Sequence, residues 1–194
     1  MVADIELVLD LANSRDPERD GLATPGGLGA WLEAHGLGPV APETLLRAPE
    51  FRDLREVVRE LLASAAEGRD LPPQAVERLN ATSRLVPVVV ELEVGTSGAI
   101  VLEAPAAANP TARALGLLAR CAARVLGSRE GMRIRRCPAA RCGRFFLAGR
   151  ADRVWCSTAC GNRTRVARHL ARRRGSDGPG NAEARSVSME RAVP

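Results

Sequence analysis

Residues 133–174 read RIRRCPAARCGRFFLAGRADRVWCSTACGNRTRVARHLARRR, and this stretch decides how the last part of the chain folds. It holds four cysteines in two close pairs, Cys137 with Cys142 and Cys156 with Cys160, and 13 residues separate the pairs. Two close cysteine pairs at this spacing are typical of a tetrahedral zinc site with four thiolate ligands. The pattern therefore predicts one structural Zn²⁺ whose four coordination positions are all filled by protein.

The residues around the cysteines predict how the metal-binding segment folds. Proline and glycine next to the first pair favour a tight knuckle, and the aromatic run 145–147 predicts a short strand with 154–156 as its partner. Ser157 is a favourable N-cap for a helix over 158–173. Cys160 then lies in the first helical turn, where the helix dipole favours a thiolate. A knuckle, a hairpin and a helix together predict a small treble-clef-like zinc finger over residues 131–174.

Arginine is concentrated in the same segment. Residues 131–174 carry 13 Arg and one Asp, net +12, whereas residues 1–130 carry 13 Arg against 19 acids, net −6. All 28 basic residues are Arg, a bias that coding composition alone can produce. The clustering is more informative, because it exceeds what solubility requires and would gain affinity for a polyanion by releasing counterions. The candidate nucleic-acid contacts lie on the predicted helix: Asn162, Arg163, Arg165, Arg168 and Arg172.

The first 130 residues have the patterns of an acidic, mainly helical domain. Apolar spacing and capping residues predict four or five helices and one β-hairpin. The helices are expected at 2–13, where the apolar residues also alternate as in a strand, and at 28–34, 50–67, 72–83 and 110–126, and the hairpin at 86–94 with 99–103. The fold class expected for the whole chain is therefore α+β. Cys121 lies within an apolar helical pattern and is expected to be a buried core residue. Residues 175–194 are polar and glycine-rich, which predicts a disordered tail.

Several functional classes find no support in the sequence. It has no lysine and no glycine-rich phosphate loop, so we do not expect an enzyme. His35 is expected to be solvated at a helix end, and His169 is expected to face solvent or a phosphate. No apolar run approaches the roughly 18 residues that span a bilayer, and no signal-peptide pattern is present at the N-terminus. We therefore expect a cytoplasmic protein with no membrane partner, in which reduced cysteines hold metal rather than form disulfides.

The segment with WCS at 155–157 and CGNR at 160–163, followed by the basic helix, resembles the CGNR zinc-finger family of bacterial proteins. The acidic part, with LDLAN at 9–13 and WLEAHGL at 31–37, resembles the ABATE domain that accompanies this finger. The second cysteine pair encloses three residues here, where many family members have four. The resemblance implies a DNA-binding, stress-linked transcription regulator that associates with the nucleoid when bound to DNA.

The leading hypothesis is a zinc-dependent DNA-binding regulator whose body, residues 1–130, senses a signal, forms a homodimer or contacts another protein. RNA is an alternative partner, since the same positive charge would attract it. A different alternative is a redox or metal sensor acting through protein contact, in which oxidation of Cys156 or Cys160 releases zinc and unfolds the finger. The sequence identifies no small-molecule ligand for the body.

Overall fold

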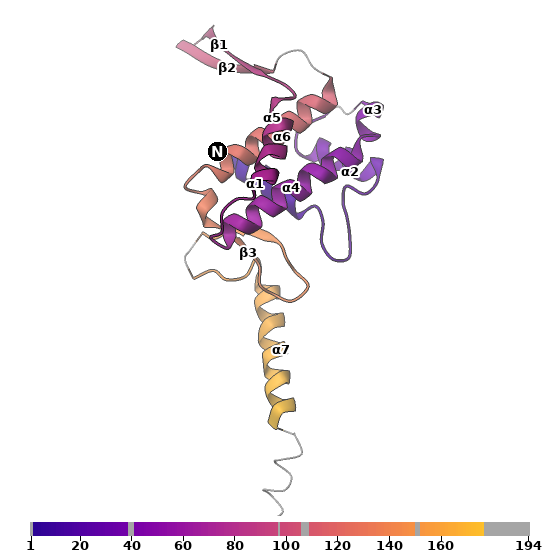
Figure 1. Cartoon of the computed structure of the whole chain (residues 1–194), viewed down its shortest axis with the longest axis vertical. Helices are drawn as coiled ribbons and strands as arrows, with labels where there is room; N and C mark the ends of the chain where they lie inside the picture. The colour runs from indigo at the N-terminus through magenta and orange to yellow at the C-terminus, as the bar shows by residue number, and fades with distance from the viewer. Residues whose placement is uncertain (1, 39–40, 97, 106–108, 150–151, 177–194) are drawn as a thin grey trace, which may run out of the picture.

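The computed structural model describes residues 2–38, 41–96, 98–105, 109–149 and 152–176. The predicted disordered tail lies outside these residues from position 177 onward. The N-terminal body consists of helices and one β-hairpin (Figure 1). Its elements are α1 (Val2–Asn13), α2 (Pro25–Ala34), α3 (Pro42–Leu45), α4 (Ala48–Ala66), α5 (Pro73–Arg84), β1 (Val88–Gly95), β2 (Gly98–Pro105) and α6 (Pro110–Leu126).

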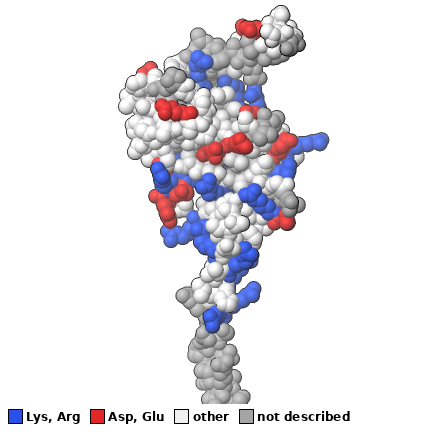
Figure 2. Space-filling view, turned by 180° about the vertical axis from the view of Figure 1, so that it is seen from behind, with Lys and Arg blue, Asp and Glu red and all other residues white. Residues whose placement is uncertain are grey.

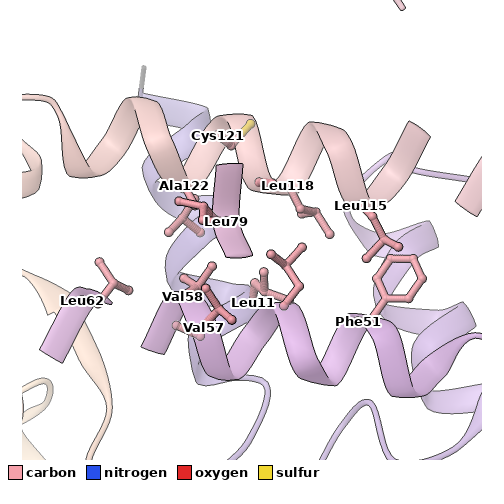
Figure 3. Close-up of a cluster of buried hydrophobic side chains, with 14 of the residues drawn as sticks. Leu11, Phe51, Val57, Val58, Leu62, Leu79, Leu115, Leu118, Cys121 and Ala122 are labelled. Atoms are coloured by element: carbon pink, nitrogen blue, oxygen red, sulfur yellow. The ribbon is translucent and has the colours of Figure 1, made fainter. Parts of the chain in front are cut away.

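The core of the body lies between α1, α4, α5 and α6 (Figure 3). The helix α4 brings Phe51, Val58 and Leu61 to one face at helical spacing, and all three are fully buried. From the opposite side, α6 contributes Leu118 and Cys121, and Cys121 is 2% exposed as predicted. Burial of this continuous apolar stripe holds the two longest helices of the body together.

Capping residues fix where the helices begin. Asn109 accepts a hydrogen bond from the backbone N–H of Ala112 at 2.8 Å, which starts α6 as expected. Thr24 does the same for α2 by accepting from the N–H of Gly27 at 3.1 Å. The prediction that this helix begins at residue 28 was therefore wrong, because the glycines that favour a loop lie inside its first turns. The short helix α3 was not predicted.

The hairpin β1–β2 forms an antiparallel ribbon in the register Val88 with Pro105 to Gly95 with Gly98. It projects from one end of the body, while the C-terminal helix projects from the other (Figure 1). Val90, Leu92 and Val94 alternate along β1 and are all exposed. The ribbon therefore adds no large side chain from these positions to the core.

The finger begins with a 3₁₀ turn, η1 (Gly131–Arg133), followed by β3 (Ile134–Arg136), β4 (Phe145–Leu147) and the helix α7 (Thr158–Ser176). The strand β4 was predicted correctly, but its predicted partner was wrong. β4 pairs antiparallel with β3, with Ile134 opposite Leu147. Residues 154–156 form no strand and instead lead into α7. The predicted α+β class, with a helical domain, a hairpin and a treble-clef-like finger, is confirmed.

The finger and the body share apolar packing. Ile134 on β3 and Phe145 on β4 are 2% and 3% exposed and belong to the same buried cluster as the core of the body. A second, smaller cluster surrounds the cysteines and contains Phe146 and Ala148. Strand β4 thus has one side in each cluster, and β3 joins the body cluster through Ile134, so the body core extends past residue 130 into the segment taken as the finger. Within the described residues, no helix is both long enough and apolar enough to cross a membrane.

Candidate metal centre and basic helix

The first cysteine pair lies on the turn that joins β3 to β4. The N–H of Cys137 donates to the carbonyl of Arg144 at 2.8 Å, and the N–H of Cys142 donates to the carbonyl of Ala139 at 3.0 Å. The turn closes because Arg141 and Gly143 adopt positive φ angles of 60° and 64°. These bonds bring both sulfur atoms to the same side of the knuckle.

The second pair is positioned by the start of α7. The side chain of Ser157 accepts a hydrogen bond from the N–H of Cys160 at 3.3 Å, which confirms the predicted N-cap. Cys160 is 6% exposed and lies in the first turn of the helix, and Cys156 lies just before the cap. The helix that carries the basic residues is therefore anchored by a metal ligand at its N-terminal end.

The four sulfur atoms have the spacing of a tetrahedral metal site. All of them lie within 4.8 Å of one another. The Sγ separations are 3.7 Å for Cys142–Cys156, 3.6 Å for Cys156–Cys160 and 3.7 Å for Cys160–Cys142. Sulfur atoms bound to one zinc ion at about 2.3 Å are about 3.8 Å apart in a tetrahedron. The donor set and its geometry fit one structural zinc ion, as predicted for Cys137, Cys142, Cys156 and Cys160.

The protonation chemistry of the thiols favours a cation among them. Burial raises the pKa of Cys142, and burial also raises that of Cys156 to about 12. A hydrogen bond from Ser157 lowers the pKa of Cys160 to about 7. Thiolates crowded in a half-buried cluster repel one another, so a divalent cation is needed to hold all four in the charged form.

The CGNR segment itself builds the metal centre. Nη2 of Arg163 lies 3.2 Å from Sγ of Cys160, so its guanidinium donates to a ligand sulfur. A Cβ at Gly161 would lie 3.4 Å from Cε3 of Trp155, which indicates that the indole packs on the start of the helix. Oδ1 of Asn162 accepts from Nη2 of Arg165 at 2.7 Å. Each residue of the motif thus contacts the metal ligands, the indole or the next turn of α7.

The predicted nucleic-acid residues all lie on α7. The side chains of Asn162, Arg163, Arg165, Arg168 and Arg172 are exposed. Figure 2 shows arginines gathered around the finger below the body, where acidic residues are few. The structure therefore brings the five residues together on one helix, and their contact with a nucleic acid stays a prediction.

Sequence reasoning missed the joint between the body and the finger. Nδ2 of Asn13, the last residue of α1, donates to the carbonyl of Phe145 at 2.8 Å, and Oδ1 accepts from the N–H of Phe145 at 2.9 Å. The guanidinium of Arg59 on α4 stacks on the ring of Phe145, 5.5 Å from its centroid. The side-chain amide of Asn13 bonds both the N–H and the carbonyl of Phe145, which lies far away in the sequence, and such a contact leaves no pattern in the residues near Asn13.

The histidine of the WLEAHGL segment is also better packed than predicted. His35 stacks on Trp31 with ring centroids 4.2 Å apart, and its Nε2 lies 3.2 Å from Oδ2 of Asp10. Its side chain is 18% exposed, so the expectation of a solvated histidine was wrong. The contact ties α2 to α1 and thereby joins the two segments WLEAHGL and LDLAN.

Comparison with known families matches both parts of this architecture. Residues 6–129 match the family model ABATE, described as "Putative stress-induced transcription regulator", and residues 133–173 match the model CGNR zinc finger. A search of curated proteins returned no significant match. The first model covers more than half of the chain, and the finger that follows it holds the four-cysteine site described above. The chain therefore belongs to the ABATE family and carries a CGNR zinc finger after the ABATE domain.

Proposed function

We propose that this protein is a DNA-binding transcription regulator in which a structural zinc ion holds the basic helix α7 in place for contact with the phosphate backbone. Zinc binding fixes Cys160 in the first turn and so orients the helix relative to the body. The body carries a net negative charge and repels a polyanion, so a polyanion is directed to the positively charged finger.

One observation carries this proposal: α7 projects away from the body as a single exposed helix (Figure 1). Of the charged residues from position 163 to 173 of this helix, every one is an arginine, and all of their side chains are exposed. Beyond its first turn, the described part of α7 adds no buried residue to a core, and an exposed helix with a positive surface is suited to a groove of nucleic acid. Arg165, Arg168 and Arg172 follow one another at spacings of three and four and form one stripe.

Duplex DNA fits this surface better than single-stranded RNA. Binding to unpaired bases relies on exposed aromatic rings on which the bases stack. In the described part of the finger, Phe145 and Phe146 are buried, and Trp155 packs against Gly161. A surface of guanidinium groups without such rings is suited to the regular phosphates of a duplex.

Electrophoretic mobility shifts of labelled duplex DNA across a salt series test the proposal. If the three arginines of the stripe neutralise one phosphate each, log K should fall with log salt at a slope of about −3. Arg172→Gln should weaken binding to all sequences and reduce the slope by about 1. Arg84→Gln is the matched control, because it removes the same charge from an exposed position on α5 of the body.

Two further arms of this experiment address the metal and the type of nucleic acid. Removal of zinc with a strong chelator should abolish the shift, and added zinc should restore it. Binding that is independent of both zinc and salt would refute the proposal. Preferential competition by structured RNA over duplex DNA would replace DNA with RNA as the partner.

A further inference from the structure

An open cleft of about 1350 Å³ lies where the body meets the zinc knuckle. One wall is formed by the loop after α1 and by α4, which contribute Arg15, Arg52 and Arg59. The other wall is formed by the end of β3 and the knuckle, which contribute Arg136 and Arg141. The cleft is therefore shared between the two parts of the chain.

Acidic side chains in the cleft neutralise only part of its positive charge. Oε1 of Glu56 lies 3.2 Å from Nη1 of Arg15 and 3.1 Å from Nε of Arg55, and Oε2 lies 3.8 Å from Nε of Arg59. One carboxylate thus serves three guanidinium groups. Of these, Arg55 is fully buried and has its own bidentate partner, Asp20.

On the finger side of the cleft, acidic side chains neutralise less of the positive charge. Arg136 makes one long ion pair, 3.8 Å from Glu67, whose Oε2 lies 2.8 Å from Arg69. Arg141 has no ion-pair partner among the residues that the structure describes. In the cleft, cationic groups from both walls therefore face the same space, and they outnumber their acidic partners.

Arg59 is a fixed donor at the back of the cleft. Its side chain is 21% exposed, its Nη1 donates to the carbonyl of Ala12, and its guanidinium stacks on Phe145. Burial lowers the pKa of Arg59, the negative charge of Glu56 raises it, and repulsion by Arg136, Arg55 and Arg15 lowers it. The group stays charged, because the ordinary pKa of arginine is far above neutral pH. An anion would relieve this repulsion and use N–H donors that are already held in position.

From this arrangement we infer that the cleft between the body and the finger binds a small polyanion that carries phosphate or carboxylate groups. Guanidinium groups recognise both anions through paired N–H donors. Such a ligand would contact the body and the finger at once. It would therefore stabilise one arrangement of the zinc finger relative to the body.

The charges at the rim favour a small ligand over a nucleic acid strand. Glu18 and Asp53 also line the cleft, and neither has a side-chain ion pair in the described residues. A continuous phosphate backbone would have to pass these carboxylates, whereas a compact anion can lie between the arginines. The helix α7, which we propose contacts DNA, projects away from the body (Figure 1). The inference thus concerns a site separate from the proposed DNA contact and does not depend on it.

Isothermal titration calorimetry of the full-length, zinc-loaded protein tests this site. The probes are inorganic pyrophosphate and citrate, titrated at an ionic strength of about 0.15 M so that weak surface attraction is screened. We expect saturable binding of one equivalent of at least one probe, with a dissociation constant below about 1 mM. The tighter of the two probes identifies phosphate or carboxylate as the preferred group.

Matched variants separate the cleft from the overall charge. Arg15→Gln and Arg136→Gln remove one cation from each wall at half-exposed positions and should each weaken binding about tenfold. Arg172→Gln removes the same charge from α7 and should leave the affinity unchanged. Zinc content and the unfolding midpoint of each variant are measured alongside, because Arg136 precedes the ligand Cys137.

Two results would overturn the inference. One is the absence of saturable binding of either probe to the wild-type protein. The other is an equal loss of affinity in Arg172→Gln, which would mean that the anion responds only to net charge. Mobility shifts with the same variants distinguish the two sites, because Arg15→Gln should retain DNA binding while Arg172→Gln weakens it. Failure of one proposal therefore leaves the other open to its own test.

Discussion

Replacing Asn13 with alanine removes both hydrogen bonds through which α1 holds strand β4 of the finger. The bonds join its side-chain amide to the N–H and the carbonyl of Phe145 at 2.9 and 2.8 Å. Phe145 is 3% exposed, so water cannot easily replace the lost partners. Each bond contributes about 1 kcal/mol, and an unpaired buried group costs about 1 to 3 kcal/mol. Because two groups of Phe145 lose their partner, the free energy of unfolding should fall by about 2 to 6 kcal/mol.

Urea unfolding of the zinc-loaded protein provides the assay. Far-ultraviolet circular dichroism follows the helical body, and a colour-forming chelator follows zinc release. In the wild type the two signals should change together, because Ile134 and Phe145 place the finger strands in the body core. In the Asn13→Ala variant zinc should be released at a lower urea concentration than the body unfolds.

Asn109→Ala is the matched control for this variant. The same substitution there removes one N-cap bond, to the N–H of Ala112 at 2.8 Å, far along the chain from the joint. It should cost about 1 kcal/mol and leave the two signals coincident. If Asn13→Ala costs less than about 0.5 kcal/mol, or if zinc release and unfolding stay together, the amide does not hold the finger to the body.

Three other perturbations have defined outcomes. Cys142→Ser should abolish stoichiometric zinc binding and reduce the helical circular dichroism of α7, which metal analysis and spectra will check. Arg163→Gln should lower zinc affinity about tenfold in a chelator competition, because its guanidinium donates to Sγ of Cys160, whereas Arg168→Gln should not. Hydrogen bonds from the guanidinium of Arg55 lower the pKa of Asp20 to about 2 in the folded state. This stabilisation is complete above about pH 4 and is lost as the pH falls toward 2, so urea unfolding at these pH values should show a loss of about 1 kcal/mol after solvent screening.

The elements predicted correctly are those with strong local signals. The spacing of the four cysteines predicted the metal ligands, since both pairs need only a tight turn and a helix start. The helices α4 and α6 were predicted because their apolar stripes are long, and α6 also because Asn109 and Pro110 mark its start. In each case residues close in sequence carry the information.

The errors come from contacts between distant residues. Strand β4 pairs with β3, a three-residue strand of one isoleucine and two arginines, because the cysteine turn between them joins their ends. Ile134 gave no strand pattern because its burial depends on the body. Asn13 at the end of α1 looked like an ordinary helix-terminal residue. Its role depends on Phe145, which lies 132 residues away in sequence.

The contacts of the CGNR segment bear on the proposed contact between α7 and DNA. Arg163 donates to the ligand sulfur of Cys160, and Asn162 accepts a hydrogen bond from Arg165, so both side chains already have partners within the finger. If α7 binds DNA as proposed, we expect direct contacts to bases from later turns, where Arg168 and Arg172 are exposed and have no ion pair among the described residues. These two positions are one turn apart, about 6 Å along the helix axis. Under the proposed function, the motif determines the orientation of the helix, and the less distinctive arginines after it determine what the helix contacts.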